Sequence, residues 1–481
     1  MINYNELLKA ELQGLYGDQL EKVTKINEYY AIYSGDQEWL TNNDLDYTPT
    51  KKITNLIKKL IDTRARFMFG REPFFDVRPI KKDEKGKTTE QDLAQIKEDL
   101  LIETILKKNK FHSKLLKARK DCSIGGKVAI KLWGHKEVGL KIVFSPAQEF
   151  FPQYNLDDVD QLEKVVFLYA LNNESKPEDQ RIKKQVWEMA GRRCILNEST
   201  HDGRGRIVSV EYEDYNTSLD FIPIIIIQNG GLTGETEGIS DVARLWDNQD
   251  NYNKLTSDDI DALKFQMFGQ DVVTDAAENS LENIKVAPGA MIDLQTDVTQ
   301  SSEGRQARME RLESKFSYKD KFEDTVDRLK SDMYDTLDVP NVNLEQLKGI
   351  ITSGKSMKAI YWNLMAVCDE DWTEWDPALN QMIEYIFKMV DVYNLYGARS
   401  IVKYETTLKI ETYYPIQEDE DTQKKIDMEE VVTEVRSRKS YMSKWGEYED
   451  LDSELEQIQL EKQMMQDSYT RDLELDIEEG E

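Results

Sequence analysis

Residues Gly349-Ile350-Ile351-Thr352-Ser353-Gly354-Lys355-Ser356 match the string G-x-x-x-x-G-K-[ST] at every fixed position. In P-loop nucleotidases this string forms a loop whose backbone amides hold the phosphates of a nucleotide. It therefore decides between two kinds of protein. One is an enzyme driven by a nucleoside triphosphate, and the other is a structural part in which the same residues only join a loop to a helix.

The residues around the string lack the strand that a P-loop requires. Such a loop lies between a buried apolar strand and a helix, whereas the residues before this one (PNVNLEQLK) are polar. The best candidate for a magnesium-binding carboxylate, Asp391, falls inside a helical pattern. The string is better explained as a junction in which Thr352 or Ser353 caps a long helix and Gly354 permits a tight turn. Lys355 then lies at the helix N-terminus, where its charge is mildly unfavourable.

Composition excludes several classes of protein. The chain has 481 residues, enough for roughly two to four domains. Its 39% hydrophobic and 10% aromatic residues exclude a disordered chain. Three distant cysteines suit a reducing cytosol and predict neither a disulfide framework nor a zinc cluster. The N-terminus does not resemble a signal peptide, and no apolar run is long enough to span a membrane.

No group of residues assembles a catalytic or metal site. The histidines have no partner at ligand spacing, and neither a G-x-S-x-G string nor a cysteine–histidine pairing is present. We therefore expect no enzyme activity, no metal and no cofactor.

The charge is strongly acidic and unevenly distributed. The formal net charge of −29 argues against a conventional DNA-binding protein, which presents a basic face to phosphates. Residues 107–120 nevertheless contain seven Lys or Arg and no acid, and residues 51–71 contain seven against Asp62 alone. Residues 447–481 carry fourteen acids against two bases. The simplest interpretation of each run is a solvated face.

Hydrophobic periodicity predicts an α+β first half of the chain. Apolar residues three and four positions apart predict helices over residues 1–35, 52–69 and 90–120. From residue 127 the pattern alternates instead, which predicts a hairpin broken at Gly134. Further strands are expected near residues 163–171, 184–196, 206–213 and 221–228.

The second half contains helices with narrow apolar stripes. Helices are expected over residues 240–267 and 317–338, with strand and turn residues between them. The stripe of the second helix consists of Phe322, Val326, Leu329, Met333 and Leu337. A stripe so narrow on a helix so polar fits packing against neighbouring helices, including those of other subunits.

The longest predicted helix follows the opening string. It spans residues 355–396 and contains Pro377, which should kink it. A strand is expected over residues 402–413, and residues 417–481 are predicted to be helical and acidic.

The order of these parts resembles that of portal proteins, the head-to-tail connectors of tailed double-stranded DNA bacteriophages. The likeness covers nearly the whole chain, and its weight comes from the order and spacing of short strings. They are residues 29–35 (YYAIYSG), 55–63 (NLIKKLIDT), 67–73 (FMFGREP), 145–154 (SPAQEFFPQY), 165–169 (VVFLY), 238–242 (GISDV), 252–255 (YNKL), 257–259 (SDD) and 351–358 (ITSGKSMK).

The resemblance implies a portal fold in a ring, usually of twelve subunits, with an α/β wing, a long helical stem, a small α/β clip and a helical crown. Mapped onto this sequence, it implies the following parts: residues 1–239, the N-terminal part of the wing; 240–267, stem helix 1; 268–316, the clip; 317–338, stem helix 2; 339–353, the tunnel loop; 354–416, the long kinked helix and a wing strand; and 417–481, the crown with an acidic C-terminal tail.

The resemblance also implies a function without catalysis. The ring would occupy one capsid vertex, conduct double-stranded DNA during packaging and ejection, and contact the major capsid protein and scaffold. It would dock the terminase motor and the head–tail adaptor, first in the bacterial cytoplasm and then in the virion. The residues expected to face DNA in the tunnel loop are Asn341, Asn343, Gln346 and Lys348, and those of the loop–helix junction are Ser353, Gly354 and Lys355.

An acidic wall suits such a conduit, because every good phosphate contact would slow the sliding of DNA. Two alternatives remain open at this point. One is a P-loop NTPase of a packaging motor, and the other is an acidic cytosolic scaffold unrelated to phage. For any single loop residue the alternative is an ordinary solvated side chain.

Overall fold

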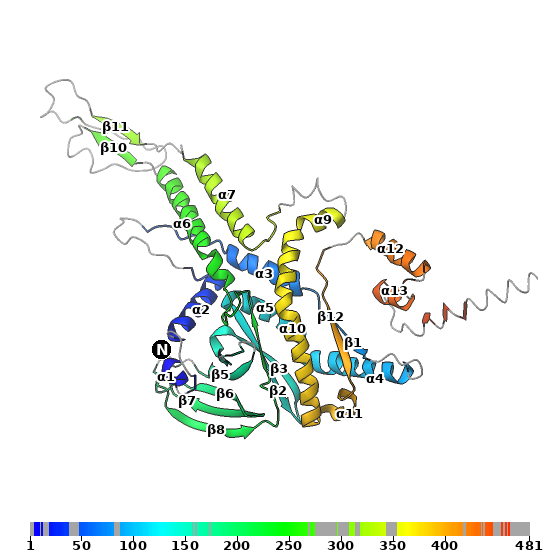
Figure 1. Cartoon of the computed structure of the whole chain (residues 1–481). Coiled ribbons are helices and arrows are strands. Elements are labelled where there is room, and N and C mark those ends of the chain that lie inside the picture. Colours follow the sequence, from blue (N-terminus) through cyan, green and yellow to red (C-terminus); the bar gives the residue numbers. More distant parts are fainter. Residues whose placement is uncertain are drawn as a thin grey trace, which may run out of the picture. The chain divides into compact units, whose positions relative to one another are not determined.

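The protein divides into two compact units, residues 1–341 with 363–414 and residues 342–362 with 415–481. The computed structural model in Figure 1 describes residues 4–9, 11–12, 19–37, 48–80, 87–155, 157–158, 161–172, 174, 176–267, 270–274, 296, 307–312, 318–342, 354–416, 420–433, 435, 438–445, 454–455, 457–458 and 460–461. Helices and strands are both abundant in these residues, which confirms the predicted α+β class.

The first unit contains sheets whose described strands all pair antiparallel. The largest is a meander of β4 (Phe150–Tyr154), β5 (Leu162–Ala170), β6 (Ile182–Ala190), β7 (Arg193–His201) and β8 (Ile207–Asn216), in that order. In a second sheet β2 (Lys127–His135) lies between β3 (Gly139–Pro146) and β9 (Ile224–Gln228). Two further pairs join β1 (Phe74–Pro79) to β12 (Thr406–Glu411) and β10 (Gln270–Thr274) to β11 (Arg308–Leu312).

Helices surround these sheets. Those of the first unit are α1 (Tyr4–Leu8), α2 (Gln19–Ser34), α3 (Leu56–Phe69), α4 (Lys87–Asp99), α5 (Phe111–Gly125), α6 (Asp241–Met267), α7 (Lys319–Thr336), α11 (Arg399–Val402) and all but the first residue of α10 (Trp362–Tyr393). A π-helical segment, Leu100–Leu106, extends α4. The second unit contains α9 (Gly354–Ile360), α12 (Glu420–Val432) and α13 (Arg438–Trp445).

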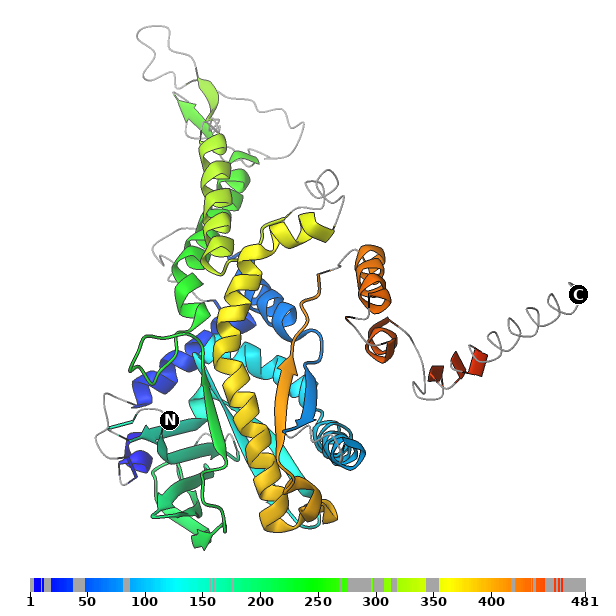
Figure 2. The ribbon, with the colours of Figure 1, turned by 45° about the vertical axis from the view of Figure 1, so that its right-hand side comes forward.

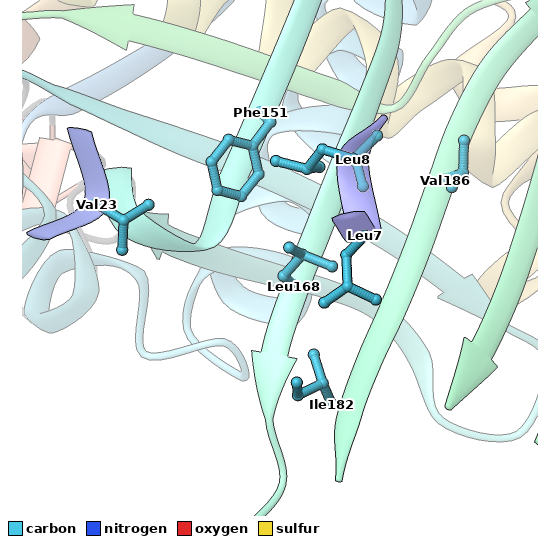
Figure 3. Packing of buried hydrophobic residues seen from close by; sticks show 8 residues of the cluster. Leu7, Leu8, Val23, Phe151, Leu168, Ile182 and Val186 are labelled. Carbon is cyan, nitrogen blue, oxygen red and sulfur yellow. The ribbon is translucent and has the colours of Figure 1, made fainter. Parts of the chain in front are cut away.

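One core cluster joins the N-terminal helices to the meander (Figure 3). Leu7 and Leu8 of α1 and Val23 of α2 pack against side chains from three strands. The strand residues are Phe151, Val166, Leu168, Ile182 and Val186. Successive side chains of a strand point to opposite faces, so the two-residue spacing within β5 puts both of its members on the face that α1 covers.

Four predicted elements are each divided in two. The predicted helix over residues 1–35 is the pair α1 and α2, and residues 9, 11 and 12 between them are not helical. The predicted strand over residues 184–196 is the pair β6 and β7, which turn at Gly191 with a φ of +66°. The predicted helix over residues 90–120 is interrupted at Lys110, whose φ is +51°. The predicted helix over residues 355–396 is also wrong as a single element, because α9 ends at Ile360 and α10 begins at Trp362.

One predicted break in regular structure was misplaced. Gly134 lies inside β2, and its role is close packing, because a Cβ there would lie 2.7 Å from the Tyr393 ring of α10. Pro377 lies inside α10 as predicted, and the kink expected there stays a prediction. Residues 52–55, predicted to be helical, are extended, for a reason described below.

Lys97 of α4 is a buried cation in an apolar setting. Its Nζ donates a hydrogen bond to the Tyr404 carbonyl at 2.9 Å and lies 4.3 Å from the centroid of the Phe387 ring. Among the described residues no carboxylate pairs with it. Burial therefore lowers the pKa of Lys97 from 10.5 to about 8.

We expect the substitution Lys97→Met to stabilise the protein at neutral pH. Below about pH 8 the folded state must bury a charge, whereas between about pH 8 and pH 10.5 the lysine is neutral when folded and charged when unfolded. The unfolded state then binds more protons, so the wild type gains stability with rising pH and the advantage of the variant shrinks. Urea unfolding midpoints across this range measure the difference, with Lys117→Met, at an exposed position, as the control. A difference that does not change with pH would contradict the prediction.

Candidate functional site

The residues predicted to line a channel fall mostly outside the described part of the chain. Asn341 is described and exposed, just after α7. Asn343, Gln346, Lys348 and Ser353 lie outside the described residues. Gly354 and Lys355 are the first residues of the short helix α9, and the side chain of Lys355 is not described. Their role in a loop–helix junction stays a prediction, as does the contact of the loop residues with DNA.

Backbone hydrogen bonds end α7 just before the residues predicted to form the tunnel loop. The N–H of Val339 donates to the Tyr334 carbonyl at 3.0 Å, five residues back, and the N–H of Asp338 donates to Asp335 at 3.2 Å. Asp338 has a φ of +54°, the left-handed conformation that ends many helices. Val339 is buried, so the helix end is held against the body of the first unit.

The described structure argues against the P-loop interpretation. A P-loop connects a strand to a helix within a parallel, helix-covered sheet, whereas every described strand pair is antiparallel. Residues 339–342 are not in a strand. Asp391 lies in α10, and its Oδ1 accepts a hydrogen bond from Arg399 Nε at 2.8 Å, with Lys403 Nζ at 3.6 Å. Within the described residues, no three His, Cys, Asp or Glu side chains converge to hold a metal ion.

The most highly charged buried place in the described structure is a cluster of two arginines and two aspartates. Arg64 of α3 donates to Asp371 of α10 from Nε at 3.1 Å and from Nη2 at 2.8 Å. Arg119 of α5 donates from Nη2 to the same carboxylate at 2.7 Å. Asp241, the first residue of α6, lies 3.6 Å from Arg64 Nη1. All four side chains are at least nine-tenths buried.

Neutral side chains complete this charged cluster. Arg119 Nη1 also donates to Ser123 Oγ at 2.7 Å and to Asn229 Oδ1 at 3.0 Å. Asn229 Nδ2 donates in turn to Asp241 Oδ1 at 3.2 Å. Burial opposes the charge of Arg119, but the carboxylates of Asp371 and Asp241 outweigh it and raise the pKa of its guanidinium. The cluster is formally neutral, and it joins α3, α5, α6 and α10 at one point.

The sequence interpretation missed this charged cluster. Arg64 and Arg119 belong to the two basic runs that were interpreted as solvated faces, and that interpretation is wrong for both residues. It holds for neighbours such as Lys58 and Arg71, which are exposed. The one available signal was position, because both arginines fall on the apolar side of amphipathic helices.

A second set of polar contacts fastens α6 along its length. Residues 50–55, here called the strap, run extended beside this helix, and Gln249, Asn253, Ser257 and Asp261 point at it from successive turns. Their oxygens accept hydrogen bonds from every second backbone N–H. The pairs are Thr50 with Asp261 at 2.8 Å, Lys52 with Ser257 at 3.0 Å, Thr54 with Asn253 at 3.1 Å and Leu56 with Gln249 at 2.9 Å.

The match between strap and helix is geometric. Two residues of extended chain advance about 6.6 Å, and four residues of helix advance about 6 Å. Side chains at four-residue spacing along the helix can therefore accept hydrogen bonds from every second backbone N–H of an antiparallel extended segment. This explains why α3 begins at Leu56, capped by Asn55, and not at Lys52 as predicted.

The charged cluster holds the start of α6, and the strap fastens the rest of its length. Helix α6 lies beside α7, and Figures 1 and 2 both show the two helices side by side. They are connected through the β10–β11 strand pair at their far end. The chain matches the family model for phage portal protein, SPP1 Gp6-like, over residues 14–468. The chain belongs to the phage portal protein family.

Membership of the portal family establishes the general role of this chain. Family members are structural proteins of the phage capsid that associate with capsid and packaging machinery, so this chain has a structural portal role in the virion. The family is not one of known enzymes. No curated protein matches the chain. Among the described residues, no helix of this portal protein is long and apolar enough to cross a membrane.

We expect Asp371→Asn to destabilise the first unit by about 3–5 kcal/mol, because it leaves two buried arginines with one carboxylate. Glu370→Gln is the matched control, since it removes one negative charge from an exposed neighbour on the same helix. Urea unfolding followed by tryptophan fluorescence measures both. Equal effects of the two substitutions would contradict the importance of the buried cluster.

We expect Asn253→Ala to loosen the strap, because Thr54 loses a buried acceptor at a cost of about 1–3 kcal/mol. Amide hydrogen exchange of residues 50–56 should accelerate. Asn251→Ala, on an exposed position of the same helix, should leave this exchange unchanged. Unchanged exchange in Asn253→Ala would show that the strap is held by other contacts.

Proposed function

We propose that this portal protein assembles into a closed ring, of about twelve subunits by the family resemblance, around a channel for double-stranded DNA. The proposal rests on membership of the portal family and on one structural observation. That observation is the incomplete burial of the seam between α6 and α7.

The seam is buried only at one end. Met333 and Tyr334 of α7 and Leu337 just after it are buried. Farther along, Phe322, Val326 and Leu329 are only half-buried. On α6, Leu263 is 49% exposed and Met267 is 67% exposed. A continuous apolar stripe that one chain leaves open is typical of a surface that another helix covers.

A ring gives each open stripe a covering partner. In a cyclic assembly the same patch of every subunit contacts a different patch of the next one, so no stripe remains uncovered. The formal charge of −29 is repeated in every subunit of such a ring. The acidic surface weakens DNA binding, which allows DNA to slide.

The parts of the chain take the following roles in this proposal. Residues 240–267 and 317–338 form the stem, residues 268–316 the clip, residues 339–353 the tunnel loop, residues 417–481 the crown, and residues 1–239 with 354–416 the wing. Asn341, Asn343, Gln346 and Lys348 face DNA, and Ser353, Gly354 and Lys355 turn the loop into α9. The clip meets the terminase motor or the head–tail adaptor, and the major capsid protein and scaffold are further partners.

Negative-stain microscopy and mass measurement in solution test the proposal directly. We expect rings with a central hole for the full chain. Leu263→Glu should lower the fraction of rings, because an unpaired carboxylate buried at each interface costs several kcal/mol. Leu171→Glu is the control, since Leu171 is also exposed but lies in a loop after β5.

Two outcomes would contradict the proposal, one the ring itself and the other the role of the α6–α7 seam. One is a stable monomer or dimer of the wild-type chain at every salt concentration. The other is an equal loss of rings in Leu171→Glu, which would separate assembly from the α6–α7 seam.

A further inference from the structure

Strand β8 is an uncovered edge of the meander. It is the last strand in the sheet order and pairs on one side only, with β7 (Figure 1). All of its residues are exposed. Glu211 accepts hydrogen bonds from Thr200 of β7 and Ser209 of β8, and the N–H of Asp214 donates to Asn197 of β7. The side chain of Asn216 accepts from the N–H of Ser218, just after the strand. On the outer side, the described residues offer no partner for the backbone of β8.

The exposed side chains of β8 are unusually apolar for a free edge. Val210 is 55% exposed, and four further apolar or aromatic side chains are also open to solvent. They are Ile207, Val208, Tyr212 and Tyr215. A long, exposed, apolar edge strand is a ready template for another strand, and proteins usually protect such edges.

The same protein does protect another edge. In β3, the N–H of Ile142 donates to Asn109 Oδ1 at 2.9 Å, and Asn109 Nδ2 donates to the Leu140 carbonyl at 2.9 Å. The N–H of Leu140 donates to the Tyr396 hydroxyl at 2.8 Å, and Lys114 Nζ donates to the Ile142 carbonyl. Side chains therefore replace the missing strand at β3. Strand β8 has no such replacement among the described residues, although its edge has one feature of a protective kind in the irregular register of its pairing with β7, which shifts at three places.

The charged side chains of β8 indicate the chemical character of a strand that can pair with its free edge. Residues 207–216 contain Glu211, Glu213 and Asp214 but no Lys or Arg. Pairing β8 with β8 of a second copy would place these carboxylates against one another, which is unfavourable across a strand pair. A strand with basic side chains between β-branched ones complements both the charge and the apolar surface.

We propose that the outer edge of β8 binds an extended, basic segment of another protein, which adds as a strand to the meander. Main-chain hydrogen bonds supply the attachment, and lysine or arginine side chains opposite Glu211 and Glu213 supply the selectivity. This inference does not depend on ring formation, since β8 and the α6–α7 seam are separate surfaces.

A fluorescent peptide of the length of β8 that alternates valine and lysine provides the probe. We expect it to bind the full chain and to slow hydrogen exchange within residues 207–216. The same peptide with alternate backbone amides methylated keeps its charge but loses the donors of one edge, so it should not bind. Val210→Lys should weaken binding on the order of fivefold, by placing like charges across the pair.

Val143→Lys is the matched control, because it adds the same charge on the protected strand β3, where Val143 is 39% exposed. Binding should survive this substitution. Equal binding of the methylated peptide, or protection outside residues 207–216, would overturn strand addition. The wild type could instead self-associate, and Val210→Lys could abolish that self-association. This outcome would overturn the proposal of a foreign partner and would assign the edge to a second copy of the chain.

Discussion

The arrangement of the first unit depends on two buried positive charges. Arg64 and Arg119 are withdrawn from water by four converging helices, and this costs several kcal/mol per charge unless carboxylates lie within hydrogen-bond distance. Asp371 accepts hydrogen bonds from both arginines, and Asp241 adds an ion pair with Arg64 at 3.6 Å. Both carboxylates reach the arginines only when α10 and α6 occupy their observed positions. The cluster therefore positions α10 and the start of α6, and α6 holds α7, which leads into the predicted tunnel loop.

Helix α6 has two unlike surfaces because it meets two unlike partners. On one side its polar stripe satisfies the backbone of the strap, and these side chains are buried although they are hydrophilic. On the other side its apolar stripe meets α7 and remains partly open at the far end. The polar contacts hold the helix to its own chain, which leaves the apolar stripe free for a neighbour.

The remaining open surfaces are of two kinds. The seam of α6 and α7 exposes apolar side chains and is suited to helix packing, whereas β8 exposes backbone groups and is suited to a strand. Protection of β3 by Asn109 and Tyr396 indicates that an open edge is not a general property of these sheets. The proposed ring contact and the proposed strand partner therefore use separate surfaces.

Sequence periodicity by itself determined the local elements α6, α7 and the β2–β3 hairpin. These depend on neighbours three or four residues apart in a helix and two apart in a strand. Composition determined the acidic character of the chain. The sequence also determined that the string Gly349–Ser356 lacks the apolar strand of a P-loop. Only the tertiary structure decided that Arg64 and Arg119 are buried, that the strap is extended, and that β1 pairs with β12. Their partners lie far away along the chain, and a charge or a backbone amide can leave water only where such a partner is brought to it.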